Sequence, residues 1–157
     1  MLSHLLAYDP FENLQHDISR ADAATPDLAA TVLDLVLARR RLPGGGDPAK
    51  RIRRLIDAQA WTDAALALVA LDRSRVLRHA IHEDGEWRCT LGSPWPLPAC
   101  VDDTIEFAHA DLPLAIFGAL VGALQEKFLP ASAAALVSRA RAEPRDAVAY
   151  VNCDNFA

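Results

Sequence analysis

The apolar run from Leu112 to Leu124 constrains the fold of this chain more than any other segment. It is 13 residues long, with Asp111 before it and Gln125 after it. A membrane-spanning helix needs about 20 apolar residues, so the run predicts a helix buried inside a water-soluble domain. Because every side of such a helix is apolar, other elements have to cover every side of it. We expect Asp111 to cap this helix and the helix to end near Phe128.

The composition supports one ordinary globular domain. The chain has 157 residues, of which 52% are apolar and 24% are charged, and this is enough to bury a core without further support. The net charge of −5 argues against a generally basic nucleic-acid binder. Cys89, Cys100 and Cys153 are odd in number and widely spaced, which predicts reduced thiols in the cytoplasm. The first residues lack the basic start of a signal peptide, which agrees with that location.

A capping residue followed by proline predicts the start of three helices. The capping side chain accepts hydrogen bonds from the first turn, and proline at the first helical position loses none. A fourth helix is apolar all round and should lie near the centre. The four helices are predicted over residues 10–23, 26–41, 48–59 and 62–72, with capping pairs Asp9-Pro10, Thr25-Pro26 and Asp47-Pro48.

The chain is expected to form one domain with an internal linker. Residues 43–47 are rich in proline and glycine and should separate an N-terminal helical hairpin, residues 1–42, from the remaining helices and a β-hairpin, residues 48–157. About 40 residues seldom fold alone, so we do not place a domain boundary at this linker.

Alternating residues on both sides of Asp84-Gly85 predict the β-hairpin. Its loop can contain two residues, Asp84-Gly85, or three, with Gly85 in the left-handed conformation. The two versions differ by one position, which exchanges the faces of one strand. We favour the three-residue loop because it gathers five apolar residues on one face. These residues are Leu77, Ile81, Trp87, Cys89 and Leu91.

The segments after the hairpin complete an α+β fold. Asp103 with Glu106 predicts a short helix that ends near residue 110. Beyond the apolar helix, residues 131–142 should form another helix, and Ala147–Cys153 reads as a strand that could pair with the hairpin. The expected fold is a mainly helical single domain with a small antiparallel β-hairpin or sheet.

Two segments resemble small hypothetical proteins of high-GC proteobacteria. They are Arg54–Leu68 (RLIDAQAWTDAALAL) and Glu83–Cys89 (EDGEWRC). The resemblance covers roughly residues 50–128. It implies a bacterial cytosolic protein and nothing about mechanism, because those proteins carry no activity that could be transferred.

Two constellations could support catalysis or metal binding. In the favoured register His79 and Cys89 are cross-strand neighbours, and a histidine beside a thiol can create a nucleophile. The apolar surroundings favour instead an inert core cysteine beside a hydrogen-bonded histidine. Glu106 and His109 have the spacing that places two metal ligands on one helical face, but this motif occurs only once. We therefore expect a non-enzymatic protein without metal or cofactor, with a Cys89/His79 enzyme as the alternative.

Basic and acidic residues are separated along the chain. Residues 39–54 hold seven basic residues and one acid, whereas residues 83–111 hold seven acids and one base. The basic stretch could be a solvated surface, a binding site for phosphate or nucleic acid, or a contact with the acidic stretch of the same or another copy. The candidate binding residues are Arg39, Arg40, Arg41, Arg51, Arg53 and Arg54, with Trp95 either anchoring a partner or covering the core.

Small residues within the apolar helix add a further possibility of self-association. Gly118 and Gly122 allow another helix to approach closely, inside the domain or in a homodimer. The predicted function is a non-enzymatic binding or regulatory module of the cytoplasm. Its partner would be an unknown protein or a second copy of the chain. The second alternative to this function is phosphate or nucleic-acid binding through residues 39–54, and the net charge disfavours nucleic acid.

Overall fold

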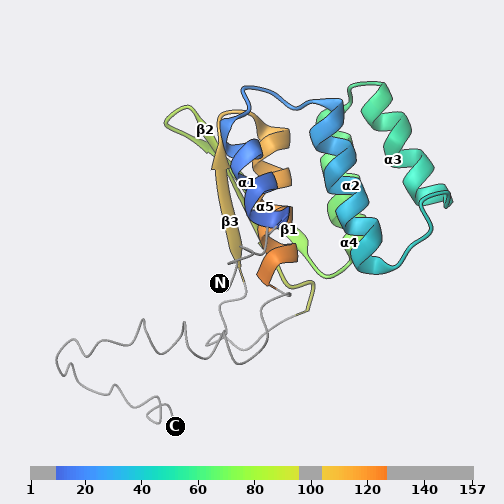
Figure 1. The fold of residues 1–157 in the computed structure, drawn as a ribbon. Coiled ribbons are helices and arrows are strands. Elements are labelled where there is room, and N and C mark those ends of the chain that lie inside the picture. The colour runs from blue at the N-terminus through green and yellow to red at the C-terminus, as the bar shows by residue number, and fades with distance from the viewer. Residues whose placement is uncertain (1–9, 96–103, 127–157) are drawn as a thin grey trace, which may run out of the picture.

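The computed structural model describes residues 10–95 and 104–126, which form helices and one antiparallel sheet (Figure 1). The elements in order are α1 (Pro10–Arg20), α2 (Pro26–Arg40), α3 (Asp47–Asp57), α4 (Trp61–Asp72), β1 (Val76–Glu83), β2 (Glu86–Gly92), β3 (Ile105–His109) and α5 (Leu112–Glu126). The α+β class predicted from the sequence is confirmed. The predicted helix over 131–142 and strand over Ala147–Cys153 lie outside the described residues. Within the described ranges, no helix has both the length and the hydropathy to cross a membrane.

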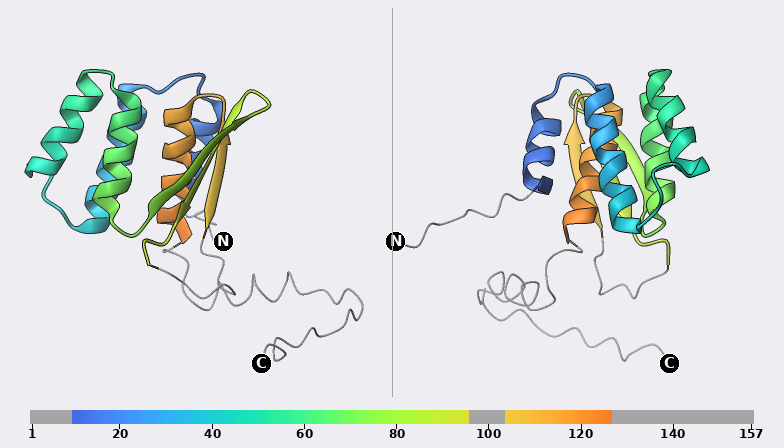
Figure 2. Two further views of the ribbon diagram at one scale, coloured as in Figure 1. Left: turned by 180° about the vertical axis from the view of Figure 1, so that it is seen from behind. Right: turned by 45° about the vertical axis from the view of Figure 1, so that its right-hand side comes forward.

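Helix α5 occupies the centre, as its apolar sequence predicts. Every residue from Leu114 to Leu124 is buried. The sheet covers one side of α5, and α1, α2 and α4 contact the others (Figure 2). Because α1 and α2 both pack on α5, the helices before the proline- and glycine-rich linker share the core of the later elements.

The two glycines of α5 face the sheet of the same molecule. A Cβ atom at Gly118 would lie 2.3 Å from Cδ1 of Phe107 in β3, which is far inside van der Waals contact. A Cβ atom at Gly122 would lie 3.3 Å from Cγ2 of Ile105. This face of α5 is therefore occupied within the domain, which agrees with the first of the two interpretations of Gly118 and Gly122 and leaves no room for a pair of α5 helices from two copies.

We expect Gly118→Ala to lower the free energy of unfolding by roughly 1–2 kcal/mol, because the steric cost exceeds the helix propensity gained by alanine. Urea unfolding followed by circular dichroism measures the change. Gly122→Ala is the control, since the nearest atom to its added Cβ is Nε2 of the flexible Gln15 side chain, at 3.2 Å. Equal stability of Gly118→Ala and the parent protein would contradict the close approach of Phe107.

The helix boundaries agree with the capping signals in part. The Thr25 side chain accepts a hydrogen bond from the Leu28 amide at 3.3 Å, as predicted. Asp47 is not a cap, because α3 begins at Asp47 itself and Gly46 precedes it without a side-chain bond.

Helix α4 is less enclosed than its sequence predicts. Leu66 is 40% exposed and Ala70 is also exposed, so an apolar strip of α4 reaches the surface.

The hairpin has the register of the two-residue loop and not the one that we favoured from the sequence. His82 pairs with Trp87, and Asp84 and Gly85 form a two-residue loop with φ values of 51° and 85°. Two positive φ values define a type I′ turn, for which Asp-Gly is a preferred sequence. A bulge between Leu77 and His79 then shifts the pairing so that Leu77 still lies opposite Leu91. The prediction of a three-residue loop is therefore wrong.

The third strand replaces a predicted short helix. Residues Ile105–His109 form β3, which pairs antiparallel with β2. The alternation of buried Ile105 and half-buried Phe107 with exposed Glu106 is the period-two pattern of a strand. The sheet order is β1-β2-β3. Its inner face, which holds Cys89, Leu91, Ile105 and Phe107, packs on α5, and no described helix covers its outer face (Figure 1).

A buried arginine joins the start of β1 to the end of α5. The Arg75 side chain is 5% exposed, and its Nη2 lies 3.6 Å from Oε2 of Glu126. In the preceding turn, the Ser74 hydroxyl donates to the buried carboxylate of Asp72. The Arg75–Glu126 pair thus joins the connection between α4 and β1 to the central helix, and the Ser74–Asp72 bond lies within that connection.

Candidate functional site

The predicted Cys89–His79 pair does not form. His79 lies opposite Thr90 on the outer face, whereas Cys89 lies opposite Ala80 on the inner face and is fully buried. Neighbouring positions on a strand point to opposite faces, so the register separates the two side chains. Burial also raises the pKa of the Cys89 thiol to about 11, which keeps it protonated near neutral pH. The catalytic arrangement considered from the sequence is therefore wrong.

The predicted Glu106–His109 metal pair is also separated by the strand. Glu106 accepts a hydrogen bond of 2.7 Å from Nη1 of Arg88 on the outer face, and this bond with its charge raises the pKa of Arg88. His109 lies opposite Trp87 on the inner face, and its Nδ1 accepts a 2.9 Å hydrogen bond from the Asp111 amide. A spacing of three brings side chains together on a helix but not on a strand. In residues 10–95 and 104–126, no three His, Cys, Asp or Glu side chains gather to hold a metal ion.

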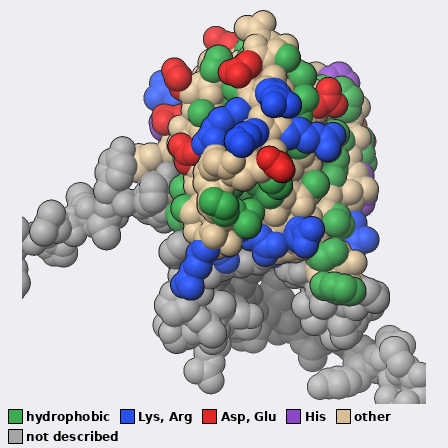
Figure 3. Space-filling model, turned by 90° about the vertical axis from the view of Figure 1, so that its right-hand side faces the viewer, with side chains coloured by type: hydrophobic (Ala, Val, Ile, Leu, Met, Phe, Trp, Pro, Cys, Tyr) green, Lys and Arg blue, Asp and Glu red, His purple; other side chains and the backbone are tan. Residues whose placement is uncertain are grey.

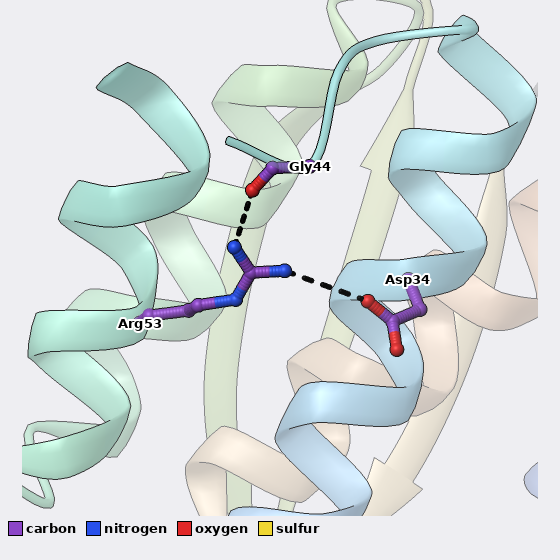
Figure 4. Close-up of polar contacts among 3 residues, drawn as sticks. All are labelled: Asp34, Gly44 and Arg53. Carbon is purple, nitrogen blue, oxygen red and sulfur yellow. Dashed lines mark hydrogen bonds and ion pairs between the residues drawn. The ribbon is translucent and has the colours of Figure 1, made fainter. Parts of the chain in front are cut away.

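Several of the predicted binding arginines have local structural roles. Arg39 and Arg40 lie in the last turn of α2, and Arg41 is its left-handed C-cap with φ 52°. Positive side chains at this end of a helix stabilise its dipole. Arg53 connects α3 to the loop before it, because its Nη1 donates to the Gly44 carbonyl and its Nη2 lies 3.9 Å from Oδ1 of Asp34 (Figure 4).

Arg51 instead borders a groove between α3 and α4, which we call the basic groove. Its volume is about 510 Å³. The lining residues are Asp47, Pro48, Arg51 and Ile52 from α3, Ala67, Ala70 and Leu71 from α4, and Arg73 directly after α4. Ala67, Ala70 and Leu71 of α4 supply one wall of the groove, and two arginines from separate segments line it.

The backbone explains how Arg73 comes to lie beside the groove. Arg73 is the C-cap of α4 in the left-handed conformation, with φ 55°, where glycine is the usual residue. The packing of α3 on α4 then brings Arg73 to the same groove as Arg51. Further exposed basic residues, Lys50 and Arg54, lie on α3, and Figure 3 shows Lys and Arg side chains gathered on this side of the molecule. Arg73 was missed from the sequence because it lies 19 residues beyond Arg54.

The predicted acidic stretch is divided among different places. Glu83, Asp84 and Glu86 are exposed at the hairpin turn, at the opposite end of the molecule from α3 (Figure 1). Glu106 bonds to Arg88, and Oδ2 of Asp111 accepts from the Ala24 amide at 3.4 Å. Asp102 and Asp103 lie outside the described residues. The basic groove and the acidic hairpin turn therefore do not meet within one molecule.

Trp95 is 74% exposed, so the prediction that it covers the core is wrong. Its part in binding a partner stays a prediction.

Comparisons of the chain with protein-family models, with curated proteins and with solved structures give no match. The basic groove is therefore the candidate site on physical grounds alone.

Proposed function

We propose that the protein is a non-enzymatic binding module that holds an acidic segment of a partner protein in the basic groove. One observation carries this proposal. Arg51 and Arg73 come from separate segments and border the same apolar groove between α3 and α4. The cytoplasmic location also belongs to the proposal and rests on the reduced cysteines expected from their spacing.

The groove can combine two sources of binding free energy. Its apolar wall, with the half-buried Leu71 and the exposed Ala70, gains from burial against an apolar side chain of the partner. The planar guanidinium groups of Arg51 and Arg73 can each hold a carboxylate through two parallel hydrogen bonds. Exposed ion pairs contribute only about 0–1 kcal/mol each, so the charges chiefly speed and orient association while the apolar contact supports affinity.

The alternatives from the sequence have less support. The Cys89/His79 enzyme loses its geometric basis because the two side chains lie on opposite faces of the sheet. Nucleic-acid binding would use the phosphate-binding capacity of the same arginines. However, the net charge of the chain is −5, which disfavours a polyanion such as nucleic acid.

Fluorescence anisotropy with a labelled peptide of alternating glutamate and leucine tests the proposal. We expect Arg51→Gln/Arg73→Gln to weaken binding by about tenfold, which corresponds to two exposed ion pairs. Added NaCl should weaken binding by the parent protein as well. Arg20→Gln is the control, because it removes an exposed arginine from α1.

Binding that is the same in the parent protein, the double variant and the control would contradict the proposal. Preferential binding of a DNA duplex over the peptide, lost in the same double variant, would assign the groove to nucleic acid instead.

A further inference from the structure

We propose that the acidic partner in the basic groove is a second copy of this chain, which inserts the tip of its β1–β2 hairpin. This inference rests on the proposed function and names its partner. The hairpin tip comprises Ile81, Glu83, Asp84 and Glu86, which are all exposed.

The hairpin tip carries more negative charge than its neighbouring cation neutralises. Three of the four residues from Glu83 to Glu86 are acidic, and Glu83 lies directly opposite Glu86 in the register. Like charges at directly opposed positions destabilise a hairpin. Arg88 donates its 2.7 Å hydrogen bond to Glu106, and its charge also attracts Glu83 and Glu86. One arginine thus serves three carboxylates, so the tip keeps a surplus of negative charge for an external cation.

An apolar side chain lies on the same face as these carboxylates. Ile81 is 45% exposed and precedes Glu83 by two positions, so both side chains project from the outer face of the sheet. Two positions on a strand span about 6.5–7 Å. The tip thus presents a branched apolar side chain with carboxylates close beside it.

The basic groove has the complementary arrangement. Ala70 and Leu71 provide apolar surface for Ile81, and the guanidinium groups of Arg51 and Arg73 provide partners for Glu83 and Glu86. The contact has to form between two molecules, because the hairpin turn and α3 lie on opposite sides of the folded domain (Figure 2). A tip-to-groove contact joins two different surfaces, so repeated contacts produce a ring or an open chain of copies.

Sedimentation velocity of the full chain at low salt, over a concentration series up to about 100 µM, tests this inference. The parent protein should form species larger than a monomer that dissociate as NaCl is added. Two variants each remove one surface. Glu83→Gln/Glu86→Gln neutralises the tip, and Arg51→Gln/Arg73→Gln neutralises the groove. Each should weaken self-association by about tenfold or more.

An equimolar mixture of these two variants gives the sharpest result. The tip variant retains an intact groove, and the groove variant retains an intact tip, so the mixture can form one native contact. We expect it to yield dimers that do not grow with concentration. Glu12→Gln/Asp17→Asn is the control, because it removes the same charge from the exposed side of α1 and should leave the parent behaviour unchanged.

Three results would overturn the inference. They are a parent protein that stays monomeric, association that the tip substitutions leave intact, and a mixture that grows beyond dimers. A monomeric parent protein that still binds the acidic peptide would leave the proposed function in place with a different partner. A parent protein that neither binds the acidic peptide nor self-associates would remove both proposals.

Discussion

Replacing Phe117 with alanine is expected to lower the free energy of unfolding by about 3–5 kcal/mol. Phe117 on α5 is fully buried, and it is the largest of the fully buried side chains in the described residues. Removal of its ring leaves a cavity beside α5, the helix on which the sheet and three other helices pack. Domains of this size are stable by about 5–15 kcal/mol, so this single change removes a large share of the total. Equilibrium urea unfolding gives the value.

Leu66→Ala is the control for this prediction. Leu66 is 40% exposed on α4, so its truncation should change stability by about 1 kcal/mol at most. If Phe117→Ala does not fold, Phe117→Leu provides a smaller cavity and a measurable intermediate loss. Equal effects of the Phe117 and Leu66 substitutions would contradict the central position of α5.

We expect the Cys89 thiol to resist modification in the folded protein near neutral pH. Cys89 is fully buried, and burial raises the pKa of its thiol from 9.0 to about 11. A Cys100→Ser/Cys153→Ser background leaves Cys89 as the one thiol of the chain. Reaction with a disulfide reagent should then proceed only as fast as the chain opens, and denaturant should make it rapid. Rapid reaction of the native protein would contradict the burial of Cys89.

The same pKa shift predicts a loss of stability at high pH. The unfolded thiol loses its proton near pH 9, whereas the folded thiol keeps its proton until about pH 11. The contribution of the protonated thiol is therefore complete below pH 9 and disappears as the pH rises to 11. Urea unfolding at pH 8, 9, 10 and 11 measures this loss. Cys89→Ala, which has no thiol to titrate, should lack this part of the pH dependence.

Local signals in the sequence were sufficient for much of the fold. The apolar run around Phe117 predicted a buried central helix, and the Thr25-Pro26 pair predicted the start of α2. The hairpin register was wrong because strict alternation was given more weight than the turn preference of Asp84-Gly85. One bulged residue near Leu77 allows both the two-residue turn and an apolar inner face.

The candidate site could be predicted only in part. Arg51 belongs to the basic stretch that the sequence displays, but Arg73 reaches the groove through the packing of α4 on α3. An informative signal was present in α4, which is apolar on all sides yet is covered only in part by α2, α3, α5 and β1. An exposed apolar surface on such a helix is a reason to look for a groove there, and the exposed Ala70 lines the basic groove.

The central helix also has a consequence for biosynthesis. In the described part of the chain, α5 is the last element to leave the ribosome, yet α1, α2, α4, β2 and β3 all contact it. Short helices are marginal in water without tertiary contacts, and before α5 emerges α2, α3 and α4 have only one another to pack against. The apolar surface that the earlier elements bury on α5 stays exposed until residues 112–126 follow. The nascent chain is therefore a natural client for chaperones that shield apolar surface, and folding completes only after nearly the whole core has been synthesised.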